Sequence, residues 1–493
     1  MPRMAKVAAG HHLRKQPWRR TAASAAIPVA IAVATAWLAF KTGDTKTPVA
    51  AVATQAELHD RLMAWAASNG ANLGDVAIRA GPYGRGLFTR RKATVGATLY
   101  EVPETLWFSA PTLKAYSTFR VFLDDADFTT VLNRNAFPEK ALLAWGLCHE
   151  IHQSQSWWKP YLDTLPRASR DSPPTMLWNE TQRDALHSRT AATMLQLWDE
   201  ALRTTHSDGQ KYFDGRAKRS ALGSNPGVDA ATLAAVDVET WLWAYFMVTS
   251  RAFDCQLPRG EGGEVTSSKH FTSGREELGL VPIVDLANAA PLSTNDNTMV
   301  LTMPDKVAFY SVRAPKALKR GSEVLQNYAG TPRALSPTQH YLFMYGFVDR
   351  NLDNSIGDFV TVEMHRDGQS TPTDADVWVI NADGVVPEGF VRAAGGDTGT
   401  VLAAISQAAE SALHDAPSTL DEDMTAMRTG RLSHWLHAAL LFRIRWKRIV
   451  QKLVTTKGST TNVASLPQRP RNVHTVTRMK ATSMYRLVIE TIY

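Results

Sequence analysis

The sequence predicts an α+β protein in which a small β-rich domain is split by a helical insertion and followed by a mostly helical C-terminal domain. Short strand-like segments between Gly- and Pro-rich turns occupy residues 76–102, and strand patterns return only from residue 280. Between about 137 and 252, and again after about 395, the apolar residues recur with the 3.6-residue spacing of helices. With 493 residues the chain exceeds what one hydrophobic core fills, which predicts two or three domains.

The β-rich part begins with a short amphipathic helix from Gln55, which the Asn69-Gly70 pair ends because these residues favour a helix stop. Strands are expected at 98–102, 280–285, 298–303, 307–312 and 323–326. The segments AFPEKALLAWGLCHEIHQ and VETWLWAYFMVTSRAF are expected to be helices of the insertion.

The C-terminal helices open at residues 418–423, a capping box with acids over the positive helix end. A helix at 430–453 is expected to carry its Arg and Lys residues on the face opposite an apolar row of Leu432, Trp435, Leu436, Ala439 and Leu440. We therefore divide the chain into a basic N-terminal segment and linker (1–54), a split β-rich domain (55–350) with its insertion at about 105–245, a helical domain (351–455) and a basic tail (456–493).

Charge is concentrated at the two ends of the chain. Residues 1–43 hold seven Lys or Arg and residues 443–486 hold eleven, with no acid in either segment, whereas the body at 44–442 has more acids than bases. A nucleic-acid-binding protein would carry a basic face on its working domain, so no nucleic-acid partner is expected. The basic stretch 443–486 is interpreted as a solvated helix face followed by a linker-like end, in preference to a contact for an acidic partner or a membrane.

Cysteine usage argues against a metal centre. The sequence contains only Cys148 and Cys255, and no CxxC or HxxxH spacing supplies the four ligands of a structural zinc site. Both are interpreted as buried free thiols, and no metal is expected.

The uncharged run at 22–40 follows a basic, acid-free segment and approaches the length that crosses a bilayer. A single-pass membrane anchor fits this length, and an organellar transit peptide fits the Arg- and Ala-rich composition. A cleaved secretory signal fits least. The sequence therefore favours a membrane-anchored or organellar protein, in the mitochondrion or plastid, over a cytoplasmic one.

Four short motifs follow one another along the chain. They are YGRGLF at 83–88, SRAF at 250–253, VPIVDLAN at 281–288, and GSEVLQNY at 321–328 with YGFV at 345–348. Each is weak alone, but in this order the chain resembles the SET-domain methyltransferases. SWWKPYLDTLP at 156–166 and the stretch 418–450 resemble the helical insertion and C-terminal lobe of the RuBisCO large-subunit methyltransferase branch.

The resemblance implies a protein-lysine methyltransferase that uses S-adenosylmethionine and grips a protein substrate with its C-terminal helical domain. The implied cofactor-binding positions are Tyr83, Gly84, Arg85, Gly86, Arg251, Asp285, Asn288, Ala289, Tyr328 and Tyr345. Gly84 and Gly86 suit a turn that a cofactor approaches closely. A cation such as Arg251 suits the cofactor carboxylate, and Asn288 supplies a polar group.

The acceptor lysine has to react as a neutral amine, which a dry aromatic channel favours. The implied lysine pocket comprises Ser250, Phe253, Asp285 and Phe347, with Tyr328 as the catalytic tyrosine. The Tyr328 hydroxyl is expected to orient the amine and to favour the charge that develops near the transferred methyl group.

Two departures separate the chain from the family pattern. The family follows the Asn with His, but here Asn288 precedes Ala289, which removes a hydrogen-bonding group from the cofactor pocket. The loop 254–279 is longer and more polar than the resemblance implies, and we interpret it as a tolerated insertion in preference to a flexible lid over the site.

Three alternatives stay open. A histidine-directed methyltransferase on the same fold is opposed by Phe253, since an imidazole would suit a polar neighbour. A catalytically inactive SET-like binding protein is supported by Ala289 and opposed by Tyr328, Arg251 and Asn288. A membrane-tethered scaffold would use the run at 22–40 as its functional part.

Overall fold

The chain divides into two units, residues 1–54 and 55–493, and the second contains every element described below. The computed structural model describes residues 54–82, 84–134, 138–167, 173–221, 230–254, 278–289, 298–302, 309–314, 316–326, 328, 337–349, 359–364, 376–381, 398–456 and 479–480. The apolar run at 22–40, Tyr83, nearly all of the loop 254–279 and most of the tail lie outside them. None of the helices within these described ranges is long and apolar enough to cross a bilayer.

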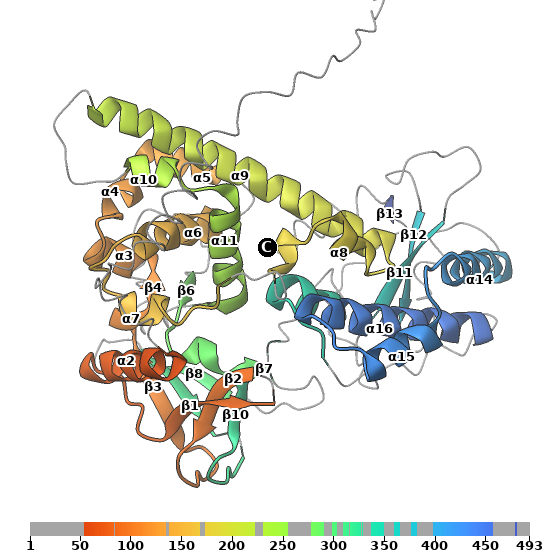
Figure 1. The fold of residues 1–493 in the computed structure, drawn as a ribbon, viewed down its shortest axis with the longest axis horizontal. Helices are drawn as coiled ribbons and strands as arrows, with labels where there is room; N and C mark the ends of the chain where they lie inside the picture. Colours follow the sequence, from red (N-terminus) through yellow and green to blue (C-terminus); the bar gives the residue numbers. More distant parts are fainter. Residues whose placement is uncertain are drawn as a thin grey trace, which may run out of the picture. The chain divides into compact units, whose positions relative to one another are not determined.

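The first sheet brings distant parts of the sequence together. After helix α2 (Gln55–Ser68), strands β1 (Val76–Gly81) and β2 (Gly84–Thr89) form an antiparallel pair. β10 (Glu323–Gln326) adds to the other edge of β2 in antiparallel register, and β7 (Asn288–Ala289) pairs with β10 in parallel. Three of the four motifs therefore meet in one sheet, in the order β1-β2-β10-β7 (Figure 1).

Two three-stranded antiparallel sheets complete the β-rich part. Their orders are β3-β9-β8 and β4-β6-β5. The strands are β3 (Thr98–Pro103), β9 (Phe309–Arg313), β8 (Thr298–Thr302), β4 (Phe108–Ser109), β6 (Leu278–Leu280) and β5 (Ala252–Asp254). The strands expected at 98–102, 298–303, 307–312 and 323–326 are confirmed within two residues at each end.

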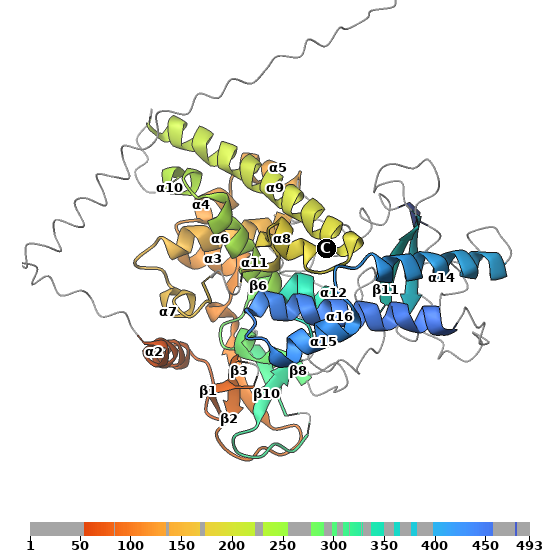
Figure 2. The same ribbon diagram turned by 45° about the vertical axis from the view of Figure 1, so that its right-hand side comes forward.

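Helices fill the chain between β4 and β5, as the insertion predicts. They are α3 (Ala110–Tyr116), α4 (Arg120–Leu123), α5 (Ala126–Asn133), α6 (Pro138–Ile151), α7 (Lys159–Leu162), α8 (Glu180–Asp184), α9 (Arg189–Ala221), α10 (Ala230–Ala234) and α11 (Val238–Arg251). α6 packs against α11, and both are buried on most faces because α9 and the sheet β4-β6-β5 cover them (Figures 1 and 2).

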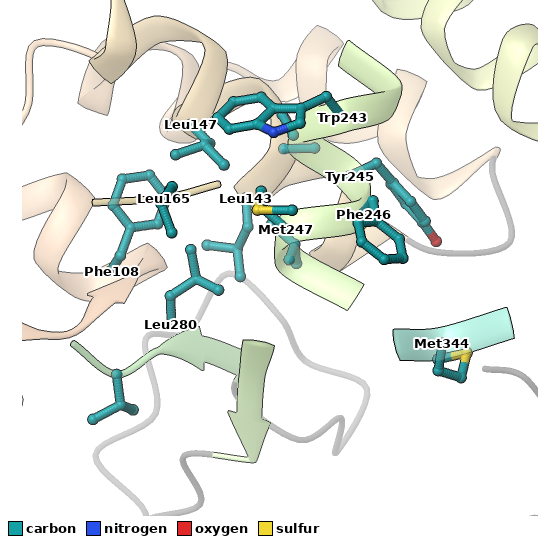
Figure 3. Close-up of a cluster of buried hydrophobic side chains, with 14 of the residues drawn as sticks. Phe108, Leu143, Leu147, Leu165, Trp243, Tyr245, Phe246, Met247, Leu280 and Met344 are labelled. Atoms are coloured by element: carbon teal, nitrogen blue, oxygen red, sulfur yellow. The ribbon is translucent and has the colours of Figure 1, made fainter. Parts of the chain in front are cut away.

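The core between these helices and the sheet fixes where α11 ends. Figure 3 shows Leu143 and Leu147 of α6 beside Trp243 and Met247 of α11, with Leu280 of β6 below them. All five side chains are at least 95 % buried, and each apolar side chain buried in this way contributes about 1.5–3 kcal/mol. The last turn of α11 is thereby held against β6, at the point where the candidate site begins.

The C-terminal part combines helices with a small sheet. α12 (Pro337–His340) continues into a π-helical turn (Tyr341–Tyr345). β11 (Phe359–Met364), β12 (Asp376–Asn381) and β13 (Met479–Lys480) then form an antiparallel sheet, and α14 (Thr398–His414), α15 (Leu420–Thr429) and α16 (His434–Thr456) supply the helices. The capping box is confirmed, because Thr419 and Glu422 bond each other's backbone N–H.

The prediction that the basic side chains of the last helix face solvent is wrong in part. α16 starts at His434 rather than at 430, and its Arg445 and Lys447 side chains are buried. Lys447 Nζ lies 2.7 Å from Asp423 Oδ2, and Arg445 Nη1 donates to Thr338 Oγ1 at 2.8 Å. Buried charges of this kind require such partners, so part of the basic run fastens α16 to α15 and α12.

Gly209 of α9 tests the packing of this core. An added Cβ would lie 2.6 Å from the fully buried ring of Trp145, whereas at Gly215 of the same helix it would meet only Arg219 Nη1 at 3.8 Å. We expect Gly209→Ala to lower the free energy of unfolding by about 1–3 kcal/mol through overpacking.

Gly215→Ala is the matched control, and it should raise the free energy of unfolding by about 0.5–1 kcal/mol because alanine favours the helix. Denaturant unfolding followed by circular dichroism measures both values. A Gly209→Ala protein as stable as the Gly215→Ala protein would show that α9 does not pack on Trp145 in this way.

Candidate functional site

The candidate site is organised around a turn that the sequence did not predict. Residues 281–285 were expected to extend a strand, but β6 ends at Leu280 and the chain turns into a 3-10 segment (Val284–Leu286). Ile283 adopts φ +71°, a conformation that a β-branched residue rarely accepts and that recurs at functional sites. Gln326 of β10 holds the turn by donating to the Val284 carbonyl at 2.8 Å.

Arg251 and Asp285 form a buried ion pair at this turn. Arg251 is the last residue of α11, and its Nη1 lies 3.1 Å from both Asp285 Oδ2 and the Asp285 carbonyl oxygen. The Asp285 side chain is fully buried, and that of Arg251 is 19 % exposed. Burial lowers the pKa of Arg251, but the Asp285 charge, the neighbouring tyrosines and the hydrogen bond to Asp285 together raise it above its ordinary value, so the arginine stays charged.

Two polar atoms of this pair have no hydrogen-bond partner among the described residues. They are Asp285 Oδ1, an acceptor, and Arg251 Nε, a donor. Leaving a buried polar atom unpaired costs about 1–3 kcal/mol, and more when the group is charged. Such atoms mark a place where a ligand that offers both a donor and an acceptor would be stabilised.

Asn288 lies between β2 and β10 and uses both of its amide hydrogens within the protein. Its Nδ2 donates to the Arg85 carbonyl at 3.1 Å and to Glu323 Oε1 at 2.8 Å. This geometry turns Oδ1 of Asn288 away from both partners. Gly86 makes the arrangement possible, because a Cβ there would lie 2.6 Å from Asn288 Nδ2 and from Glu323 Oε1.

The two glycines of the first motif thus differ in what surrounds them. Protein side chains fill the space at Gly86, where open space for a cofactor was expected. Gly84 has φ +94°, and a Cβ at this position would meet no described atom within 4 Å. The Arg85 side chain points toward the insertion, where its Nη1 donates to the Thr164 carbonyl at 2.8 Å.

An aromatic cluster forms the other side of the site. The Tyr328 hydroxyl donates to the Ala287 carbonyl at 2.7 Å, and the Tyr345 hydroxyl donates to the Tyr328 carbonyl at 3.4 Å. The Tyr328 ring lies 4.7 Å from that of Tyr345 and 6.4 Å from that of Phe347, between ring centres. Tyr328, two residues after the end of β10, and Arg251, at the end of α11, therefore converge on the same turn.

The charge states of this cluster are set mainly by burial. Burial raises the pKa of Tyr345 to about 12 and moves the pKa of Tyr328 above its ordinary range, so both remain phenols at neutral pH. His340, whose ring lies 5.5 Å from that of Tyr345, has its pKa lowered to about 4 by burial and then by the charge of Lys140. The cluster is therefore uncharged near pH 7.

Two residues predicted for the lysine pocket have other neighbours. The Ser250 hydroxyl donates to the Phe246 carbonyl of its own helix at 2.7 Å. The Phe253 ring packs on Tyr310, with 5.6 Å between ring centres. The structure brings Tyr328, Tyr345 and Phe347 together, whereas Tyr83 lies outside the described residues.

Comparison with known proteins identifies relatives of this chain. No family model matches the chain. The chain is 23 % identical over 426 residues to a [fructose-bisphosphate aldolase]-lysine N-methyltransferase, chloroplastic, of Arabidopsis thaliana, covering 76 % of this chain and 77 % of that protein. It is also 22 % identical over 423 residues to the chloroplastic ribulose-1,5 bisphosphate carboxylase/oxygenase large subunit N-methyltransferase of Nicotiana tabacum. That match covers 76 % of this chain and 75 % of the tobacco protein.

Two solved structures show the same fold. The SET domain of LSMT bound to lysine and AdoHcy superposes with a TM-score of 0.56 at 18 % identity, over 82 % of this chain and 92 % of that one. Rubisco LSMT bound to sinefungin and monomethyllysine superposes with a TM-score of 0.58 at 17 % identity, over 81 % of this chain and 91 % of that one. The chain has the SET-domain fold of the RuBisCO large-subunit methyltransferases. The fold class expected from the sequence is confirmed.

Sequence reasoning missed two residues of this SET domain that bond the predicted ones. Glu323 was recognised only as part of a strand, although it accepts the Asn288 amide. Tyr161, in the insertion, donates to Asp285 Oδ2 at 2.8 Å. A charged residue at the start of strand β10 was the available signal for Glu323. No local pattern indicated Tyr161, which lies 124 residues from its partner.

Gly86→Ala tests the close packing within the SET sheet. The added Cβ would collide with Asn288 and Glu323, so we expect the free energy of unfolding to fall by about 1–3 kcal/mol. Gly74→Ala is the control, because its Cβ would meet only Asn72 Oδ1 at an ordinary 3.7 Å. Thermal unfolding of both variants measures the difference. Equal stabilities would contradict the placement of Asn288 against β2.

Proposed function

We propose that this protein transfers a methyl group from S-adenosylmethionine to a lysine side chain of a protein substrate. The observation that carries the proposal is a pair of buried atoms without a hydrogen-bond partner among the described residues, Arg251 Nε and Asp285 Oδ1, beside the Tyr328 cluster. The amino-acid end of S-adenosylmethionine carries a carboxylate and an ammonium, which match one donor and one acceptor. The lysine methyltransferases among the relatives support the same reaction.

The remaining cofactor contacts are proposed for residues beside the Tyr328 cluster. Asn288 Oδ1 is proposed to accept from a ribose hydroxyl, because the two hydrogen bonds that Nδ2 donates fix the orientation of this amide. The backbone N–H of Ala289 is proposed to serve the adenine in place of the imidazole that the family carries there. The proposed set also includes Tyr83, Gly84, Arg85, Gly86, Tyr328 and Tyr345.

When bound, S-adenosylmethionine supplies a methyl group on a sulfonium centre that is open to attack by an amine. Tyr328 is proposed to orient that amine. Its hydroxyl hydrogen is engaged by the Ala287 carbonyl, so the oxygen lone pairs face elsewhere and can accept an N–H of the lysine. Uncharged Tyr345 and Phe347 beside it exclude water, which lowers the pKa of an incoming lysine and favours its neutral, nucleophilic form.

The test is transfer of labelled methyl from S-adenosylmethionine to proteins of an extract from the source cell, followed by mapping of the modified residue. Tyr328→Phe removes only the orienting hydroxyl, so labelling should slow by on the order of 10²-fold or more. Tyr341→Phe is the matched control. Its ring stacks on Phe347, but its hydroxyl has no hydrogen-bond partner in the described part of the chain.

Each outcome decides between the alternatives. The proposal is supported if the label is found on lysine, if Tyr328→Phe slows the labelling as expected, and if Tyr341→Phe does not. Label on histidine favours the histidine-directed enzyme on the same fold. No labelling by the unchanged protein, in an extract shown to contain unmethylated acceptors, contradicts the enzyme and favours the inactive SET-like binding protein.

The C-terminal helices are proposed to grip the protein substrate, with domain boundaries at 351–455 as the sequence suggests. Arg443 and Lys447 of α16 both pair with the buried Asp423 of α15, which makes these two helices one firm body. A firm helical surface suits a role in docking a folded partner. The SET domain with its insertion is proposed to span 55–350.

Residues 1–54 are proposed to direct the protein to an organelle, since both curated relatives are chloroplastic. Retention of the run at 22–40 as a membrane anchor is the narrower proposal. Fusing 1–54 to a fluorescent protein should yield organellar fluorescence, and carbonate extraction should leave an anchored fusion in the pellet. Release into the supernatant at reduced length would favour a cleaved transit peptide, and diffuse cytoplasmic fluorescence would contradict both.

A further inference from the structure

We propose that Tyr161 of the helical insertion is a positioning residue that presents the free oxygen of Asp285 to an amine. This inference rests on the proposed function and adds a residue that no motif of the site contains. The amine belongs either to the cofactor or to the acceptor lysine, because both offer N–H donors of the same chemistry.

Tyr161 reaches the site from α7, which is remote from Asp285 in the sequence. Its side chain is fully buried, and its hydroxyl donates to Asp285 Oδ2 at 2.8 Å. Three residues later, the Thr164 carbonyl accepts from Arg85 Nη1 at 2.8 Å. One short segment of the insertion thus contacts two of the predicted cofactor positions, Arg85 and Asp285.

The two oxygens of Asp285 have different surroundings. Oδ2 accepts from the Tyr161 hydroxyl and from Arg251 Nη1, whereas Oδ1 is buried without a partner among the described residues. The terminal torsion of an aspartate is broad and nearly two-fold, so one arginine contact alone leaves the carboxylate free to turn. A second donor on Oδ2 fixes its plane and keeps Oδ1 directed into the site.

The Tyr161 hydroxyl remains a donor throughout the working pH range. Burial and the neighbouring Asp285 charge both raise the pKa of Tyr161 well above its usual value, and the charges of Arg251 and Arg85 only partly oppose this shift. The hydroxyl therefore keeps its proton, and the orientation of the carboxylate does not depend on pH near neutrality.

The test compares Tyr161→Phe with a matched control in the full-length protein. Tyr161→Phe keeps the buried ring and removes one oxygen. Tyr212→Phe does the same at a second buried tyrosine of the insertion, whose hydroxyl also lies beside a carboxylate, that of Asp125. Calorimetric titrations use three ligands: S-adenosylmethionine, 5′-methylthioadenosine, which lacks the amino-acid end, and free L-lysine added to protein saturated with S-adenosylhomocysteine.

Loss of a hydrogen bond to a charged group should weaken amine binding on the order of 10-fold or more. We expect Tyr161→Phe to weaken the binding of either S-adenosylmethionine or lysine by this factor. The ligand whose affinity falls identifies the amine that Asp285 receives. Binding of 5′-methylthioadenosine should stay unchanged, because a general loosening of the fold would weaken it as well. Tyr212→Phe should leave all three affinities unchanged.

Wild-type affinities of Tyr161→Phe for all three ligands would overturn the positioning role and leave the proposed function standing. If Tyr161→Phe binds 5′-methylthioadenosine and S-adenosylmethionine more weakly by the same factor, the positioning role is overturned in favour of a structural role. If the unchanged protein binds no S-adenosylmethionine, the proposed function itself fails and the role of Tyr161 fails with it.

Discussion

Burial of one ion pair, Arg251 with Asp285, is the constraint on which the rest of the site depends. A charged pair removed from water is tolerated only when additional hydrogen bonds satisfy it, and here those bonds come from three separate segments. The end of α11 supplies the guanidinium, the turn after β6 supplies the carboxylate and a carbonyl, and α7 supplies Tyr161. The helical insertion is therefore part of the site, because without it Asp285 would lose a donor.

The second constraint is the parallel pairing of β7 with β10. It places Asn288 beside Leu325 and against the narrow space that Gly86 leaves in β2, so the amide is fixed by Arg85 and Glu323. The same pairing brings the chain after β10 back over the turn, where Tyr328 bonds the Ala287 carbonyl. Ala289, at the position where the family carries His, still lies in the strand and keeps its backbone in the sheet. The departure from the family pattern thus removes a side chain from a segment that is paired in the sheet.

Local patterns predicted most of the strands and helices, since periodicity is a property of neighbouring positions, and the site residues remain predictions that the family resemblance supplied. What they missed depends on contacts between distant positions. Residues 281–285 look like a buried strand, but bonds from Arg251 and Gln326 make them a turn. Arg445 and Lys447 look like a solvated face, but Asp423 and Thr338 draw them inside. Glu323 and Tyr161 were missed because their partners lie 35 and 124 residues away.

Titration of S-adenosylmethionine into the unchanged protein and into Arg251→Met tests whether the buried Arg251–Asp285 pair holds the amino-acid end of the cofactor. Arg445→Met is the matched control, because this arginine is also buried but bonds Thr338 and Asp349 in the C-terminal part. We expect Arg251→Met to bind S-adenosylmethionine on the order of 10- to 100-fold more weakly than the unchanged protein, because a charge-assisted hydrogen bond is lost, and Arg445→Met to bind it normally. Equal affinity of Arg251→Met and the unchanged protein, with both folded, would contradict this expectation.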